Sequence, residues 1–101
     1  MKLRLLDEAE SELRQVMLYY EQCRQGLGHN FHERVTDVLS AVRNEPLRFP
    51  IYEGRRLRRE YRRARVVRFP YIIVFQIRAD EVVVVALAHT SRAPGYWNRR
   101  N

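Results

Sequence analysis

The sequence of 101 residues has a single cysteine, one lysine, four glycines and four prolines. Because Cys23 stands alone, both a disulfide framework and a cysteine-based zinc cluster are excluded. No apolar run approaches the roughly 20 residues needed to span a bilayer, and the first residues lack the apolar stretch of a signal peptide. We therefore expect a cytoplasmic protein without membrane contact, metal or cofactor, in which residues 1–101 form one domain.

The scarcity of lysine makes the positive charge almost entirely arginine. Lysine and arginine total 19 against 12 acidic residues, which gives a net charge of +7. Eight arginines and one carboxylate, Glu60, lie in residues 55–68, here called the arginine segment, so this segment carries the whole excess. The guanidinium fork binds phosphate or carboxylate bidentately, which favours a surface for an anionic partner over a merely solvated strand face. The predicted contacts are Arg55, Arg56, Arg58, Arg59, Arg62, Arg63, Arg65 and Arg68.

Apolar residues recur every three or four positions in two stretches, which predicts two helices. The first follows a short strand at Lys2–Leu6 and starts where Asp7 and Glu10 have the spacing of a capping box. Gly26 and Gly28 are expected to end it, because glycine tolerates left-handed backbone angles.

The second helix is expected to start at Asn30, where Glu33 repeats the cap spacing, and to end near residue 44. The short connection makes the two helices an antiparallel hairpin. From residue 56 onward the period changes to two, and three strands are predicted at 62–68, 71–77 and 82–88. The predicted class is α+β, in the order β-α-α-β-β-β, with the helices on one face of a sheet whose last three strands form an antiparallel meander.

The residues after the last predicted strand offer a second constellation. His89, Arg65, Arg92 and Tyr96 are the types of residue that a metal-independent ribonuclease uses to move protons and stabilise the phosphorane. The structural alternative is that His89 hydrogen-bonds locally while Trp97 fixes the tail against the sheet, and the residues alone favour it. Aromatic anchors and arginines such as Trp97 and Arg99 also suit a protein interface.

Five motifs stand in one order along the chain: Tyr19-Tyr20-Glu21; Gly26-Leu27-Gly28 with Phe31; Asn44-Glu45-Pro46 with Phe49-Pro50; Arg68-Phe69-Pro70-Tyr71; and residues 89–94 with Trp97 and Arg99. Together they resemble the RelE/ParE superfamily, the toxins of type II toxin–antitoxin (plasmid-stabilisation) systems. The resemblance spans about the whole chain and is closer to the ParE-like branch. It implies the same β-α-α-β-β-β fold.

The resemblance implies one of two activities. ParE-like members poison DNA gyrase, whereas RelE-like members cut mRNA on the ribosome. The nucleases often place an arginine after the aromatic residue that opens the third strand, where this chain has Ile72 after Tyr71. We therefore expect a gyrase-poisoning toxin that forms a hetero-oligomer with a cognate antitoxin encoded alongside it. The alternatives are a ribosome-dependent mRNA endoribonuclease and a basic nucleic-acid-binding module.

Overall fold

The computed structural model describes residues 1–54 and 57–100, and there the predicted β-α-α-β-β-β order is confirmed. A short 3-10 helix, η1, follows the second helix. Arg55 and Arg56 of the arginine segment lie outside the described residues. Within the described ranges no helix is long and apolar enough to cross a membrane. The elements are β1 (Lys2–Leu5), α1 (Asp7–Cys23), α2 (Leu27–Asn44), η1 (Pro46–Arg48), β2 (Arg62–Arg65), β3 (Tyr71–Arg78) and β4 (Glu81–His89).

The four strands form one sheet in the order β1-β4-β3-β2. β2, β3 and β4 pair antiparallel, as the meander predicts, while β1 joins the outer side of β4 in parallel, with Leu5 opposite Val84. The sheet is therefore mixed, a pairing that the pattern of β1 alone did not indicate. β4 also carries a bulge next to Val85, because Val74 faces Ala86 while the neighbouring Phe75 faces Val84.

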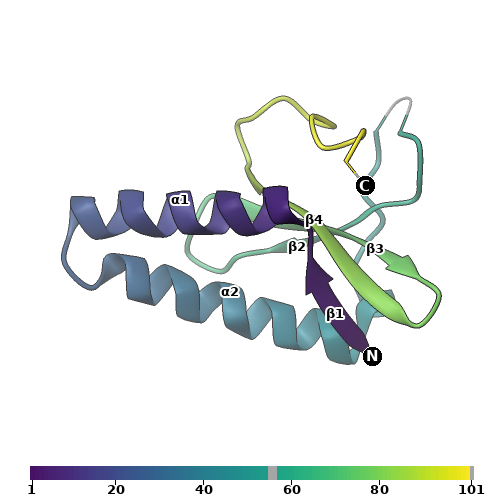
Figure 1. The fold of residues 1–101 in the computed structure, drawn as a ribbon, viewed down its shortest axis with the longest axis horizontal. Coiled ribbons are helices and arrows are strands. Elements are labelled where there is room, and N and C mark those ends of the chain that lie inside the picture. The colour runs from purple at the N-terminus through teal and green to yellow at the C-terminus, as the bar shows by residue number, and fades with distance from the viewer. Residues whose placement is uncertain (55–56, 101) are drawn as a thin grey trace.

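Each face of the sheet has its own core. On one face α1 and α2 lie side by side, and Phe31, Val35 and Val42 pack against alternate sheet residues such as Ile73 and Phe75. We call this the helix-side core. Figure 1 shows the last residues looping back beside the segment that precedes β2. These two segments cover the other face, and we call the core beneath them the tail-side core. Its buried residues are Leu6, Tyr61, Val74, Val83, Val85, Ala86, Ala88 and Trp97.

The capping box predicted at Asp7 and Glu10 does not form. Leu6 is the N-cap of α1, in an extended conformation, and no side chain caps the helix. The amide of Leu6 donates to the carbonyl of Val84 (2.9 Å) and its side chain is buried, so the strand passes directly into the helix. Asp7 and Glu10 instead lie inside the first turn, where their charge favours the positive end of the helix.

The predicted start of the second helix is also corrected. α2 begins at Leu27 rather than Asn30, after Gly26, whose φ of +87° is left-handed. The Glu21 carboxylate of α1 accepts hydrogen bonds from the amides of Gly26 (2.9 Å) and Gly28 (3.0 Å), so the cap comes from the neighbouring helix. Gly28 does not end α1, because α1 ends at Cys23 and Gly28 lies in the first turn of α2. A Cβ at Gly28 would lie 2.6 Å from the carbonyl oxygen of Met17. It is a point of close approach between the helices.

Candidate functional site

The arginines of β2 point to both faces of the sheet. Ala64 packs into the helix-side core, so the flanking Arg63 and Arg65 point to the opposite face, where both are exposed. Arg62 is largely buried, with its Nη1 donating to the carbonyl of Phe49 at 2.7 Å. Of the predicted contacts in this strand, Arg63 and Arg65 therefore share one surface and Arg62 helps to hold the preceding loop.

The other described arginines of the segment are spread along it. Arg58 and Arg59 are exposed before β2, and the backbone amide of Arg58 donates to the Asn98 side chain of the tail at 2.8 Å. Arg68 is exposed in the turn between β2 and β3. The charge that is contiguous in sequence is thus divided among several surfaces.

The tail, residues 90–100, is anchored by Trp97. Its side chain is only 1% exposed and makes edge-on ring contacts with Tyr52, Tyr61 and Tyr96 at centroid distances of 4.9, 6.3 and 5.2 Å. The Tyr61 hydroxyl also donates to the backbone carbonyl of Asn98 (3.2 Å). Trp97, predicted as a contact residue, therefore lies in the tail-side core, whereas Arg99 is exposed.

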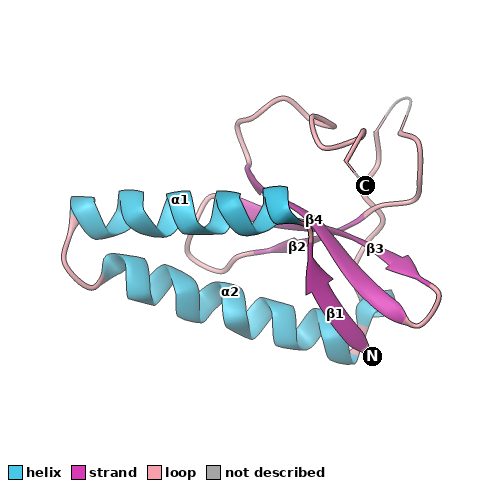
Figure 2. Cartoon of the chain, viewed as in Figure 1, coloured by secondary structure: helices cyan, strands magenta, loops and turns pink. Residues whose placement is uncertain are grey.

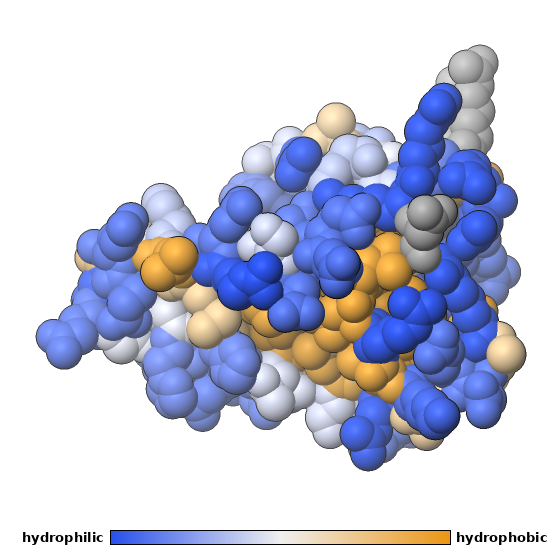
Figure 3. Space-filling model, viewed as in Figure 1, coloured by the Kyte–Doolittle hydropathy of each residue, from blue (hydrophilic) through white to orange (hydrophobic). Residues whose placement is uncertain are grey.

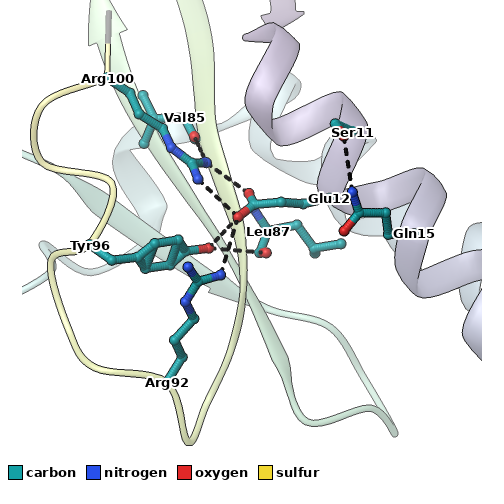
Figure 4. Close-up of polar contacts among 8 residues, drawn as sticks. All are labelled: Ser11, Glu12, Gln15, Val85, Leu87, Arg92, Tyr96 and Arg100. Atoms are coloured by element: carbon teal, nitrogen blue, oxygen red, sulfur yellow. Dashed lines mark hydrogen bonds and ion pairs between the residues drawn. The ribbon is translucent and has the colours of Figure 1, made fainter.

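A single carboxylate, Glu12 of α1, contacts three polar side chains of the tail (Figure 4). Its oxygens accept hydrogen bonds from the Tyr96 hydroxyl (2.6 Å) and from Arg100 Nη1 and Nη2 (2.8 and 3.0 Å). Arg92 Nη1 lies 3.8 Å away, and the Arg92 guanidinium stacks over the Tyr96 ring at 3.6 Å. We call these four residues the Glu12 cluster.

The Glu12 cluster also satisfies the open edge of β4. β1 ends opposite Val84, and among residues 1–54 and 57–100 no strand pairs with β4 beyond that point on this side. There, the amide of Leu87 donates to Glu12 Oε1 (3.1 Å), the carbonyl of Val85 accepts from Arg100 (2.9 Å), and the carbonyl of Leu87 accepts from Tyr96 (3.4 Å). Burial, followed by the hydrogen bond to Glu12, raises the pKa of the Tyr96 hydroxyl, which keeps it a donor at neutral pH.

His89 faces away from this cluster. Its ring contacts Tyr71 on the helix side at a centroid distance of 5.1 Å. The Ser91 amide donates to His89 Nδ1 (3.0 Å) and the Ser91 hydroxyl lies 2.7 Å from it. Because Nδ1 accepts from an N–H group, the hydrogen-bond network assigns the proton of the neutral ring to Nε2.

The structure thus brings together two of the four residues predicted as catalytic, Arg92 and Tyr96. Arg65 points to the face opposite His89, and in the described ranges it forms no hydrogen bond or ion pair with the other three. Sequence reasoning missed Glu12 and Arg100. One signal was available: Glu12 lies three residues after the buried Ala9 and four before the half-buried Val16, so an acidic residue interrupts an apolar face.

Fold and site together define a small α+β protein with a mixed four-stranded sheet and an arginine-rich surface. Residues 3–94 match the model of the family described as the ParE toxin of the type II toxin–antitoxin system parDE, and the chain belongs to this family. A solved structure of the chromosomal ParDE TA system from P. aeruginosa has a similar fold, with a TM-score of 0.61 and 16% identity. The similarity covers 88% of this chain and 95% of that chain. No curated protein matches the chain.

Proposed function

We propose that this toxin acts by binding and poisoning DNA gyrase in the cytoplasm, without catalysing RNA cleavage. The match to the ParE toxin family supports gyrase as the target, and the separation of His89 from Arg65 on opposite faces of the sheet argues against RNA cleavage. A ribonuclease needs its base, its acid and its phosphate-binding cations around one scissile bond. Ile72, where the related nucleases often have an arginine, is half-buried beside the tail-side core. Its position removes a further phosphate contact from such a site.

We also propose that a cognate antitoxin, encoded alongside, holds the toxin silent in a hetero-oligomer. Figure 3 shows apolar surface gathered between α1 and α2 and over β1, where Leu3, Leu5, Leu13 and Leu39 are only partly buried. An extended antitoxin segment would place apolar anchors there and carboxylates on the exposed arginines. We expect association to slow strongly as salt rises; an association rate that is flat between low and high salt would contradict the electrostatic part.

The target is tested by expressing the chain under tight induction in bacteria while DNA synthesis and translation are followed by separate labels. A gyrase poison stops DNA synthesis first, with filamentation and normal early translation. His89→Ala should keep this arrest, because the proposal gives the ring no catalytic role. Purified toxin should also inhibit supercoiling by gyrase.

The opposite result is equally specific. Early arrest of translation, with mRNA cut on stalled ribosomes and both effects lost in His89→Ala and Arg92→Ala, would establish the endoribonuclease instead. If neither DNA synthesis nor translation is arrested, the result would contradict a toxic activity of this chain. A basic nucleic-acid-binding module would then remain as the alternative.

A further inference from the structure

A hollow of about 390 Å³ lies where the connection between α1 and α2 meets the turn between β2 and β3. Three arginines from separate parts of the chain line it: Arg24 after α1, Arg34 on α2 and Arg68 in the turn. Asn30 and Phe69 also line it. We call it the hairpin hollow.

The positive charge in the hairpin hollow is poorly neutralised. Within the described part of the chain, Arg24 and Arg68 form no ion pair, and Arg34 forms one exposed pair at 3.7 Å. Glu33 is the only acidic residue in the lining, and its Oε1 lies 3.0 Å from His29 Nε2. Guanidinium groups that line one hollow with fewer carboxylates than cations repel one another, and an anion reduces that repulsion.

The donors of this hollow are side chains rather than helix-end amides. The amides of Gly26 and Gly28, at the start of α2, already donate to Glu21. Arg68 has a φ of +72°, a left-handed conformation that a glycine or asparagine adopts with less strain. The chain therefore tolerates backbone strain at the residue that brings a third guanidinium to the hollow.

We propose that the hairpin hollow binds a phosphate group, either free or in the backbone of a nucleic acid. Guanidinium forks match phosphate oxygens bidentately, and the side-chain NH2 group of Asn30 is a further donor. A phosphate suits the site better than a carboxylate. One phosphate group carries up to two negative charges and can therefore match both Arg24 and Arg68, which form no ion pair in the described ranges, whereas one carboxylate carries a single charge. Phe69 offers an apolar wall to the attached sugar or base. The proposal does not depend on gyrase as the target.

The test compares two double variants of the full chain. Arg24→Gln/Arg68→Gln removes two charges from the hairpin hollow. The control, Arg43→Gln/Arg48→Gln, removes two exposed charges at the other end of α2, a helix about 27 Å long: Arg43 lies in its last turn and Arg48 in η1.

Binding of a fluorescein-labelled 12-base-pair DNA is followed by anisotropy from 50 to 200 mM salt. Inorganic phosphate is titrated against the arginine Nε–Hε signals by NMR, and a labelled poly-glutamate peptide forms a third series. The buried Trp97 reports on folding in each variant.

For the hollow variant we expect DNA affinity to fall about tenfold and the slope of log K against log salt to decrease by about 2, which is roughly 0.9 for each lost phosphate contact. The control should change the slope by less than about 0.5. DNA binding that depends on the hollow identifies the nucleic acid backbone as the source. A hollow-dependent response to inorganic phosphate alone identifies a free phosphate. Equal losses in the two variants, or hollow-dependent binding of the peptide alone, would overturn the proposal. None of these readouts involves cell growth, so the outcome is independent of the proposed toxic target.

Discussion

The two faces of the sheet are held by different means. On the helix side, two regular helices bury Phe31 and a row of valines against the strands. On the tail side, irregular chain covers the sheet, as the pink segments of Figure 2 show, and its anchors are Trp97, Tyr61 and the single carboxylate of Glu12. A periodic face distributes its stability over many similar contacts, whereas the irregular face concentrates it in a few residues. Substitutions on the helix side should therefore destabilise the whole domain, whereas substitutions on the tail side should mainly detach the tail.

The largest effect is expected on the helix side. Phe31 is fully buried and contacts Tyr20, Phe69 and Tyr71. Phe31→Ala should lower the free energy of unfolding by about 4 kcal/mol, because it leaves a cavity in the main core. Urea denaturation measures this loss. Tyr19→Ala, at a residue 59% exposed on the same helix hairpin, is the control and should cost less than about 1 kcal/mol. Similar losses for both would remove the distinction between core and surface on this face.

Glu12→Ala is expected to have the next largest effect, and to act on the tail side. It leaves the Leu87 amide and Arg100 without their acceptor, which should cost about 3 kcal/mol. We expect faster hydrogen exchange at the Leu87 amide and a red-shifted Trp97 emission as the tail detaches. Glu10→Ala removes an exposed carboxylate from the same helix and should leave both signals unchanged. A Glu12→Ala protein with native exchange at Leu87 would show that the tail does not need the carboxylate.

Gly28→Ala tests how tightly the helix hairpin is closed. The added methyl carbon would lie 2.6 Å from the carbonyl oxygen of Met17, so α1 and α2 must separate, which should cost about 2 kcal/mol. Gly26→Asn is the matched control: no atom lies within 4 Å of a Cβ there, and asparagine tolerates the left-handed φ. Thermal unfolding of the two variants measures the difference. An unchanged unfolding midpoint in Gly28→Ala would mean that α1 and α2 can separate to accommodate the methyl group without a loss of stability.

The smallest effect concerns pH and Tyr96. Because the pKa of Tyr96 is raised in the folded protein, the unfolded chain loses this proton first, near its ordinary value of about 10, and stability falls as pH rises above that value. Tyr96→Phe should reduce this alkaline slope by up to about 1.4 kcal/mol per pH unit and leave the slope below pH 9 unchanged. Urea denaturation from pH 8 to 11 makes the comparison. Equal slopes in the two proteins would contradict the burial of this hydroxyl.

The helix-side face was predictable from the sequence, and the tail-side network was not. The stripe that contains Phe31, Val35 and Val42 has helical spacing, and the runs after Tyr71 and Glu81 have the composition of buried strands. These patterns record burial, which is repeated along an element. They therefore indicate which elements form and which face each one buries.

Contacts between distant residues leave no such pattern. Glu12 and Arg100 meet across almost the whole chain, and neither position alone indicates its partner. The predicted cap of α2 was wrong for the same reason. Glu21 on the preceding helix, and not Asn30, accepts the hydrogen bonds at the start of α2. His89 and Arg65 illustrate the converse. Both are suited to catalysis by type, and only the pleat of the folded sheet shows that they face opposite sides.

The parallel pairing of β1 with β4 joins the first strand of the chain to the last. During synthesis, at about 5–20 residues per second, β1 and the helix hairpin leave the ribosome before the strand that completes their sheet has been made. Neither core can close until Val84 and its neighbours have emerged, because both are built on β4. The nascent chain therefore cannot complete its native fold before β4 has been made. No activity that requires the folded sheet can therefore begin before β4 has been synthesised.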